Sequence, residues 1–407
     1  MSEAIDGRLL ADIRRSTGAN PEFVARAPGR VELLGNHTDY NGGLVLAAAV
    51  DRFTTVAGTA SAGTRASVLS LNMNQGDTFD LAGLNPESTE PQGWARYVRG
   101  VAWALQADAK APLTSAFDVT LVGNVPIGGG LSSSASLQAA LGSWLVAAGL
   151  VPGRPASTLD DDAGRMDLAR VLRRSENDFV GVGSGLLDQA SVLLGRTGHA
   201  LRLDCRTLAF ERLSLGDPAP AIVVCDSTTS RQLAEGMYNR RRAECDRVVD
   251  FFRARNPEEG VTQLRDVSLG QLMADWELLD GVGRLRARHV LTENLRVEEG
   301  TELLRIGDVE GFGRLMSASH RSSRDDFENS SRELDALVES AQEAPGFLGG
   351  KLSGAGWAGC TVNLVRAELA EEFASAVIEG YRRRTGLLAG VSTCQAAQGA
   401  TAAPFAG

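Results

Sequence analysis

Three consecutive glycines followed by a run of serines form the segment of this chain best suited to chemistry, residues 126–136, PIGGGLSSSAS. Glycines let the backbone turn and approach a ligand without steric clashes from Cβ atoms. The serines stand at the start of an apolar stretch that ends at Leu150. If that stretch is a helix, its free amide groups and dipole favour an anion, typically a phosphate, beside the serine hydroxyls.

The flanks of this segment favour a binding loop over a flexible linker, although an isolated Gly/Ser stretch is usually a linker. The strand predicted before it carries Val119, Leu121, Val122 and Val125. The helix predicted after it repeats apolar residues at helical spacing, at Leu137, Ala140, Leu141, Trp144 and Leu145. The loop is neither a G-x-x-x-x-G-K-[ST] loop nor a G-x-G-x-x-G loop, since Ser133 replaces the last glycine.

A true G-x-G-x-x-G occurs later, at residues 354–359. It is followed by an apolar segment at 361–365 that predicts a strand, whereas a dinucleotide site requires a helix there. The match therefore does not indicate dinucleotide binding.

A second polar cluster lies in residues 26–43, RAPGRVELLGNHTDYNGG. Its donors and acceptors suit a ligand rich in hydroxyl groups, and they include Arg30, Glu32, Asn36, His37, Thr38, Asp39, Tyr40 and Asn41. A surface loop with ordinary turn residues would have a similar composition, so composition alone leaves both interpretations open.

Composition limits the classes of ligand. A chain of 407 residues is long enough for two lobes with large cores, and its 43% hydrophobic and 23% charged residues are ordinary for a globular protein. The formal net charge of −10 argues against nucleic acid or an anionic membrane as a partner. An anionic ligand must then be held by backbone amides, a few arginines and a divalent cation.

The five cysteines are scattered and contain no C-x-x-C, which favours reduced thiols and gives no zinc site. The first residues lack the basic and apolar regions of a signal peptide, and no apolar run approaches transmembrane length. We therefore expect a cytoplasmic protein. Its basic charge is almost all arginine, with lysine only at Lys110 and Lys351, which we interpret as a compositional habit.

The alternation of elements predicts an α+β fold in two domains, 1–215 and 216–407, divided near the break at 217–220. In the first domain we expect helices at 6–16, 94–105 and from the aspartates at 160–162 to 177, strands within 22–60 and a strand at 200–203. In the second we expect a strand at 221–225, helices from 231 to 343, and then strand, glycine loop, strand, helix and strand as far as 394.

Segments 26–43, 126–136 and 349–360 resemble, in order and spacing, the three motifs of the GHMP kinases, and the first resembles the galactokinase signature. The likeness covers nearly the whole chain. It continues through Trp94-x-x-Tyr97, Glu176-x-x-Phe179, Asp188-Gln189, Asp204-Cys205-Arg206, Tyr238-x-x-Arg241-Arg242, Ser319-His320 and Asp325-Asp326-Phe327.

The resemblance implies a two-lobed GHMP kinase fold with mixed or antiparallel sheets and an active site between the lobes. It also implies transfer of the ATP γ-phosphoryl group to the anomeric hydroxyl of a sugar, with galactose favoured. By the same analogy Asp188 is catalytic, as a general base or as an electrostatic orienter of the C1 hydroxyl. Arg30 would lie beside Asp188 and the γ-phosphate, where a cation keeps the acid ionised and stabilises the transferring group.

The remaining site residues also follow from the resemblance. Ser134 and Glu176 match the family's Mg²⁺ ligands, and both are hard oxygen donors. The phosphates would lie on Gly128, Gly129, Gly130, Leu131, Ser132, Ser133 and Ser134, with the adenine near Trp94. The sugar would contact Asn36, His37, Thr38, Asp39, Tyr238 and Asp188. No nucleic acid or membrane partner is expected, and the sequence leaves the oligomeric state open.

One exchange departs from the family pattern, which is Gly-Arg-Val-Asn-Leu-Ile-Gly-Glu-His-Thr-Asp-Tyr-Asn in typical galactokinases. Here Glu32 stands where asparagine is usual, and Asn36 stands where glutamate is usual. The family glutamate is expected to accept a hydrogen bond from the C6 hydroxyl, so Asn36 puts the C6 group of the substrate in question. Galacturonate, L-arabinose or an amino sugar are the alternatives to galactose.

Two other functions fit the same fold. A non-catalytic sensor of sugar and ATP is the remote alternative, but the chain keeps Arg30, the serine loop, Glu176 and Asp188. A GHMP kinase acting on a non-sugar alcohol is disfavoured by the polar residues at 36–39 and by Tyr238.

Overall fold

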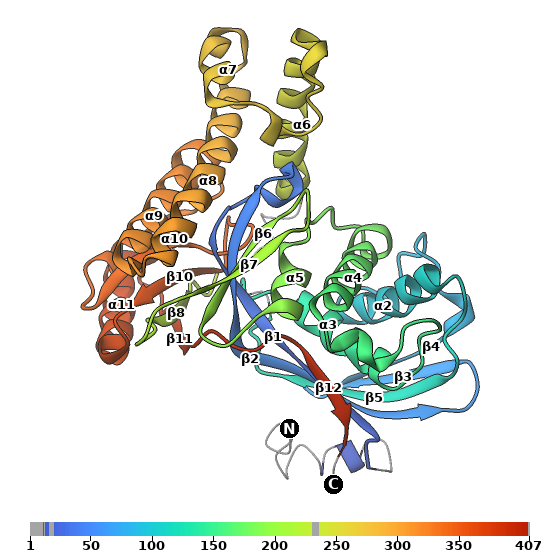
Figure 1. Ribbon diagram of the computed structural model, residues 1–407. Helices are drawn as coiled ribbons and strands as arrows, with labels where there is room; N and C mark the ends of the chain where they lie inside the picture. Colours follow the sequence, from blue (N-terminus) through green and yellow to red (C-terminus); the bar gives the residue numbers. More distant parts are fainter. Residues whose placement is uncertain (1–10, 12, 16–19, 128, 230–235, 406–407) are drawn as a thin grey trace.

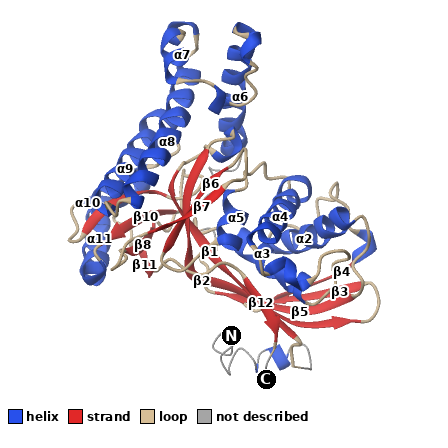
Figure 2. Cartoon of the chain, in the orientation of Figure 1, coloured by secondary structure: helices blue, strands red, loops and turns tan. Residues whose placement is uncertain are grey.

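The structure is a computed structural model that describes residues 11, 13–15, 20–127, 129–229 and 236–405. It contains two β-sheets, each packed against its own set of helices (Figures 1 and 2). Helices α2 to α5 gather over the first sheet, whereas α9, α10 and α11 lie against the second (Figure 1). Helix α7 and the adjoining parts of α6 and α8 project from this body as an arm (Figure 1).

The first sheet has eight strands, in the order β12-β1-β2-β5-β3-β4, and β6 and β7 continue from β2. All pairs are antiparallel except β3 with β5, in agreement with the mixed sheet that the resemblance implies. The strands are β1 (Phe23–Leu34), β2 (Leu44–Ser61), β3 (Arg65–Ser70), β4 (Gln75–Asp80), β5 (Ala116–Gly123), β6 (His199–Asp204), β7 (Phe210–Ser214) and β12 (Thr401–Pro404).

The helices of the first lobe are α2 (Trp94–Ala109), α3 (Ser133–Ala147), α4 (Asp162–Arg174) and α5 (Leu187–Leu194). Helix α3 is buried around most of its circumference, polar residues such as Gln138 and Ser143 included, and such a helix belongs in the centre of a core. Leu141, Trp144 and Leu145 on it are fully buried. The predicted strand, glycine loop and helix are confirmed, and the helix begins at Ser133, so that Ser133 and Ser134 belong to its first turn.

The second sheet is antiparallel, in the order β11-β8-β10-β9. Its strands are β8 (Ala221–Asp226), β9 (Phe347–Leu352), β10 (Cys360–Val365) and β11 (Gly390–Cys394). The helices of this lobe are α6 (Met237–Arg255), α7 (Leu269–Ala274), α8 (Gly281–Arg305), α9 (Val309–Ser322), α10 (Arg332–Gln342) and α11 (Ala370–Thr385). The predicted order from strand to final strand in this region is confirmed.

Strand β1 connects the two lobes. It packs against α3 and α5 of the first lobe and against α8, α9 and β10 of the second. Its C-terminal half is buried throughout. Because side chains alternate between the two faces of a strand, Arg30 and Glu32 point to the same side, while Val31 points to the other.

The chain passes from the first sheet to the second between Ser214 and Ala221, near the boundary placed at residue 215. That boundary stays a prediction. Strand β12, which was not predicted, comes from the part of the chain assigned to the second domain and pairs with the start of β1 in the first sheet. The β3–β4 hairpin was not predicted, and the helix expected at 6–16 falls largely outside the described residues.

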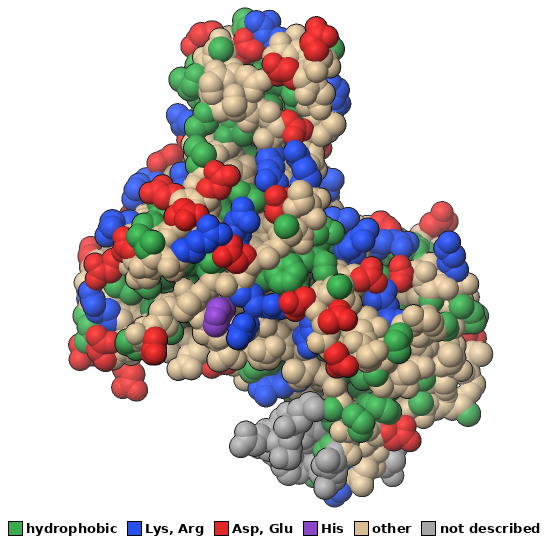
Figure 3. Space-filling view, viewed as in Figure 1, with side chains coloured by type: hydrophobic (Ala, Val, Ile, Leu, Met, Phe, Trp, Pro, Cys, Tyr) green, Lys and Arg blue, Asp and Glu red, His purple; other side chains and the backbone are tan. Residues whose placement is uncertain are grey.

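All five cysteines are free thiols. No helix in the described part of the chain has both the length and the apolar character needed to cross a lipid bilayer. On the face in Figure 3, acidic and basic side chains of the described residues are intermixed over both lobes.

Candidate active site

A cavity of about 660 Å³ lies where the two lobes meet at β1. Residues from both lobes line it: Arg30, Glu32, Asn36, His37, Asp39, Tyr97, Gly130, Ser132, Ser133, Ser134, Glu176, Val182, Ser184, Gly185, Leu187, Asp188, Tyr238, Gly354, Ala355 and Gly356. The cavity thus brings together most of the residues predicted from the sequence. Gly128 lies outside the described residues.

Arg30 and Asp188 form an ion pair at the wall of the cavity. Two nitrogens of the guanidinium, Nε and Nη2, each lie 2.7 Å from Asp188 Oδ1, and Nη1 donates to the Gly130 carbonyl at 2.7 Å. Burial alone would lower the pKa of Arg30, but the Asp188 carboxylate raises it above its ordinary value. The second carboxylate oxygen, Oδ2, accepts a hydrogen bond from Ser132 Oγ at 2.5 Å.

The glycine loop is pressed against β1. The Arg30 amide donates to the Leu131 carbonyl at 3.0 Å, and a Cβ atom at Gly29 would lie only 2.8 Å from that oxygen. Gly130 and Ser132 both have positive φ, +78° and +54°, so the loop turns sharply into α3. Gly129 and Leu131 shape this turn without lining the cavity.

The serines have different tasks. Ser136 is fully buried, and its hydroxyl donates to the Ala27 carbonyl and contacts Thr54, so it anchors the helix to the sheet. Ser132, Ser133 and Ser134 line the cavity at the N-terminus of α3, where the first backbone amides of a helix have no partner within the helix. This end of the cavity is therefore suited to an anion.

Glu176 lies in a π-helical segment, Ser175–Val180, that continues α4. Its Oε2 accepts hydrogen bonds from Ser184 Oγ at 2.9 Å and Gln189 Nε2 at 2.6 Å. Burial and the nearby Asp188 carboxylate raise the pKa of Glu176 to about 7. A buried acid beside a second acid is costly as a pair of anions, and a divalent cation would relieve that repulsion.

Tyr97, on α2, lies between these groups and was not among the predicted site residues. Its hydroxyl lies near Ser134, and burial followed by the charges of Glu176 and Asp188 raises the pKa of that hydroxyl. Ser134 and Glu176, the two predicted Mg²⁺ ligands, thus face the same part of the cavity. Among the described residues no group of three or more His, Cys, Asp or Glu gathers as a metal site.

His37 lies in the turn after β1 with φ of +59°. A carbonyl oxygen can only accept, so Nε2–H donates to Ala355 at 3.0 Å and Nδ1 accepts from the Tyr40 hydroxyl at 2.9 Å. Burial lowers the pKa of His37 to about 3, which keeps the ring neutral. Its ring packs beside Tyr238 and Phe327, at centroid distances of 5.3 and 4.5 Å.

Asp39 approaches the cavity from the same turn. Burial raises its pKa to about 7, and the charges of Asp188 and Glu32 act in the same direction. A Cβ atom at Gly185 would lie 2.1 Å from Asp39 Oδ2, so this close approach requires glycine at position 185. A neutral or readily protonated acid at this place can both donate and accept hydrogen bonds, which suits a sugar hydroxyl.

Two predicted residues are placed away from the cavity. Thr38 is fully buried, and its hydroxyl lies 2.7 Å from the Gly35 carbonyl and 2.6 Å from that of Leu44. It holds the turn in shape, and its contact with the sugar stays a prediction. Trp94 begins α2, where its indole nitrogen donates to Gln75 at 3.3 Å, and it does not line the cavity. Its adenine contact stays a prediction.

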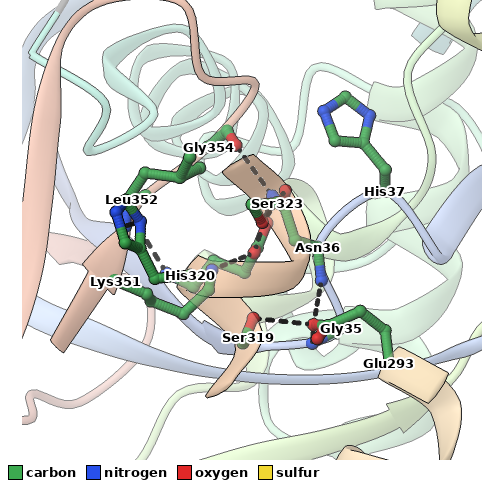
Figure 4. A network of polar contacts seen from close by, with 12 residues as sticks. Gly35, Asn36, His37, Glu293, Ser319, His320, Ser323, Lys351, Leu352 and Gly354 are labelled. Atoms are coloured by element: carbon green, nitrogen blue, oxygen red, sulfur yellow. Dashed lines mark hydrogen bonds and ion pairs between the residues drawn. The ribbon is translucent and has the colours of Figure 1, made fainter. Parts of the chain in front are cut away.

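The turn after β1 that carries Asn36, His37 and Asp39 is called the sugar-motif turn below. Helix α8 of the second lobe holds this turn through residues that the sequence did not indicate. Glu293 is fully buried, and its Oε2 accepts hydrogen bonds from the amides of Gly35 and Asn36, both at 3.0 Å. Burial alone would raise the pKa of Glu293, but the Arg296 guanidinium lowers it to about 2. His289 Nε2 donates to the Asn36 carbonyl at 2.9 Å. Figure 4 shows Glu293 reaching Gly35 from this helix.

Three family models match the chain. They are described as the galactokinase galactose-binding signature, over residues 14–60, the GHMP kinases N terminal domain, over 96–196, and the GHMP kinases C terminal, over 301–383. The first covers the turn with Asn36, His37 and Asp39, and the second covers the glycine loop, Glu176 and Asp188.

Similar proteins extend the match over the whole chain. A galactokinase from Roseiflexus sp. (strain RS-1) is 38% identical over 97% of this chain and 96% of its own length. The galactokinase of Homo sapiens is 39% identical, with 92% of both chains covered. Among solved structures, the galactokinase of Lactococcus lactis complexed with galactose is 30% identical, with a TM-score of 0.88 over 97% of this chain and 98% of that one.

A mevalonate kinase from Methanococcus jannaschii shares the fold, with a TM-score of 0.62 at 16% identity over 92% of this chain and 98% of that one. The resemblance proposed from the motifs is confirmed at full length, together with the α+β architecture. The chain belongs to the galactokinase family of the GHMP kinases.

Proposed function

We propose that the protein transfers the γ-phosphoryl group of ATP to the anomeric C1 hydroxyl of galactose, which yields galactose 1-phosphate and ADP. The observation that carries the proposal is the Arg30–Asp188 ion pair in a cavity that the glycine loop and the sugar-motif turn both line. Phosphoryl transfer depends on positioning and on neutralising charge, and this arrangement places an acid, a cation and an anion-binding helix end together.

Asp188 is the group we assign to the C1 hydroxyl. Its Oδ2 has a lone pair beyond the one that Ser132 uses, so it can accept from the sugar hydroxyl and orient it or take its proton. Arg30 keeps the acid fixed and stands beside the γ-phosphate, where its charge stabilises the transferring group.

The nucleotide phosphates would lie on Gly129 to Ser134, at the start of α3, and the adenine near Trp94. Ser134 and Glu176 would hold Mg²⁺, since both offer the hard oxygen donors that this ion prefers and the phosphates supply further ligands. When bound, the ion neutralises phosphate charge. The buried Glu176 carboxylate, with its pKa raised to about 7, fits such a partner.

The sugar would lie between Asp188 and the turn that carries Asn36, His37 and Asp39, with Tyr238 packed beside His37. The Lactococcus lactis relative was solved with galactose, which supports galactose as the substrate. L-Arabinose, galacturonate and an amino sugar stay alternatives because of the exchange at Glu32 and Asn36. The sensor alternative would keep the cavity but show no turnover.

The test is a panel of free sugars with Mg²⁺ and ATP, in which ADP release is followed by a coupled assay. We expect galactose to give the highest kcat/KM and phosphorus NMR to place the product's phosphate at C1. ADP release that is independent of sugar, or none with any hexose, pentose or uronate, would contradict the proposal.

A further inference from the structure

The exchange of Glu32 and Asn36 is resolved by what each side chain contacts. Asn36 uses its whole hydrogen-bonding capacity on the protein. Its amide nitrogen donates to Glu32 Oε1 and to the Gly354 carbonyl, both at 2.9 Å. Its amide oxygen accepts from Asn329 Nδ2 at 2.9 Å and from Ser323 Oγ at 3.2 Å. Figure 4 shows Asn36 among Ser323 and Gly354.

An asparagine side chain offers two donors and two lone pairs, and these four bonds occupy all of them. Asn36 can therefore bind a sugar only by giving up a buried partner, which leaves that partner unsatisfied. The family pattern predicts that the side chain at position 36 contacts the C6 group of the sugar. Asn36 has no free donor or acceptor for such a contact.

Glu32, in contrast to Asn36, has hydrogen-bonding capacity that the described residues do not use. Its Oε1 takes both the Asn36 amide and the Lys351 ammonium, the latter at 2.6 Å. No described residue donates a hydrogen bond to its Oε2, although the side chain lines the cavity. The cavity thus presents a carboxylate oxygen with open lone pairs where the wall carries Asn36 and Gly354.

Lys351 explains how this carboxylate is tolerated. It lies on β9, is fully buried, and supplies the counter-charge from behind the cavity wall. Asn36 and Lys351 together fix one oxygen of Glu32 and leave the other without a partner among the described residues, on a side chain that lines the cavity. The chain has only two lysines. One of them, Lys351, serves the site through its pairing with Glu32, and composition alone does not indicate this role.

The spacing fits one sugar ring. Arg30 and Glu32 are two residues apart on β1 and point to the same face, so their Cα atoms are about 7 Å apart. A pyranose with its C1 hydroxyl at Asp188 extends its far substituents toward Glu32. Of these, the hydroxymethyl group on C5 reaches furthest from the ring.

We propose that Glu32 accepts a hydrogen bond from the C6 hydroxyl through Oε2, with Lys351 as its counter-ion and Asn36 as a positioning residue. The inference rests on the proposed sugar 1-kinase activity. It names the substrate class as a neutral hexose with a free C6 hydroxyl. A uronate is excluded, because its carboxylate would face the Glu32 carboxylate.

The test compares kcat/KM for galactose and 6-deoxygalactose in the wild type and in Glu32→Gln. The wild type should prefer galactose at least about tenfold, as a hydrogen bond to a charged group implies, and Glu32→Gln should reduce that ratio by about fivefold or more. A merely structural role of Glu32 would lower kcat/KM for both sugars alike and leave the ratio intact, which would overturn the proposal. 4-Deoxygalactose is assayed in parallel. If Glu32→Gln loses the preference for galactose over 4-deoxygalactose but keeps the preference over 6-deoxygalactose, the proposal is overturned as well.

Two further variants keep the test decisive if Glu32→Gln folds poorly. Glu32→Gln with Lys351→Met removes both charges, leaves no orphaned buried ion, and should show the same reduced ratio. Glu32→Asn with Asn36→Glu restores the family order and should keep the ratio within about threefold of the wild type, because a carboxylate remains. Glu310→Gln, an exposed acid on α9 paired with Arg366, is the matched control for the ratio.

The experiment distinguishes a failure of this inference from a failure of the proposed function. If the wild type phosphorylates no sugar, the kinase proposal fails first. If it phosphorylates galactose and 6-deoxygalactose equally, or prefers galacturonate, the kinase proposal stands and the role of Glu32 is refuted.

Discussion

Arg30 and Ser132 each hold one oxygen of the Asp188 carboxylate, so the acid is fixed in place before a sugar binds. Such preorganisation leaves little reorganisation for the chemical step. It also means that the roles of these groups are separable by substitution, since in the proposed arrangement ATP contacts the loop and α3 while the sugar contacts Asp188.

Asp188→Ala should reduce kcat by about 10²–10⁴-fold, the range of a positioned acid or base, and leave ATP affinity nearly unchanged. Steady-state kinetics and calorimetric titration with ATP measure the two effects. Asp250→Ala, an exposed aspartate on α6, is the control and should behave as the wild type. Turnover near the wild-type rate in Asp188→Ala would refute its assignment.

Ionised Glu176 should lower the free energy of unfolding of the ligand-free protein at pH 7 and above. Burial and Asp188 raise its pKa from its ordinary value of 4.5 to about 7, so the folded state binds more protons than the unfolded state between these values. The free energy of unfolding therefore falls as pH rises from about 4.5 to 7, by roughly 3 kcal/mol for this group.

Glu176→Gln should then raise the free energy of unfolding at pH 8 by about 1–3 kcal/mol and abolish most activity. The amide oxygen can still accept from Ser184 and Gln189. Urea unfolding without ligands at pH 8 and pH 5 tests this, because the gain should shrink at pH 5, where the wild-type acid is protonated. A variant less stable than the wild type at pH 8 would contradict the pKa argument.

At the scale of elements, α8 determines the shape of the sugar-motif turn. Glu293 accepts from two backbone amides of that turn and from Ser319 Oγ on α9, at 2.9 Å. The charge of Arg296 stabilises this buried carboxylate. Removal of Glu293 leaves the amides buried and unsatisfied, each at a cost of about 1–3 kcal/mol.

Glu293→Ala should lower the free energy of unfolding by about 3 kcal/mol or more and raise KM for galactose, with little change in KM for ATP. Glu302→Ala on the same helix removes an exposed acid and should change stability by no more than about 0.5 kcal/mol. Equal increases in both KM values would show that α8 supports the cavity as a whole and not the turn.

The elements also show what a sequence can and cannot predict. The glycine loop with its strand and helix was predicted because all its signals lie within thirty or so neighbouring positions, where periodicity and turn residues are informative. Strand β12 was missed because its pairing with β1 joins the two ends of the chain, and four residues rich in alanine carry no strand signal.

The same limit applies to the site. Arg30, Glu176 and Asp188 were identified through motif spacing, and the structure brings them to one cavity. Glu293 lies 257 positions from Asn36, and nothing in the sequence of α8 marks it as a partner of that turn. Lys351 was not among the predicted site residues, because its role depends on a carboxylate far away on β1.

At the scale of the molecule, the two lobes share β1, and the end of the chain returns to the first sheet. Strand β12 pairs with β1 from Phe23 to Arg26, and β1 then packs against α8 and α9 of the second lobe. Neither sheet can lose its order without exposing apolar surface of the other lobe. Two sheets built in this way should unfold as one cooperative unit.

Calorimetry of the ligand-free protein should therefore give one transition, with calorimetric and van't Hoff enthalpies that agree, because β1 couples the lobes. Galactose at 100 times its Kd should stabilise that whole transition by about 2.7 kcal/mol, since the proposed sugar site lies between the two lobes. Deletion of residues 401–407 should lower Tm of the single transition, because it removes the ladder that β12 adds to β1. Two separate transitions in the full chain, of which galactose shifts only one, would show that β1 does not couple the lobes.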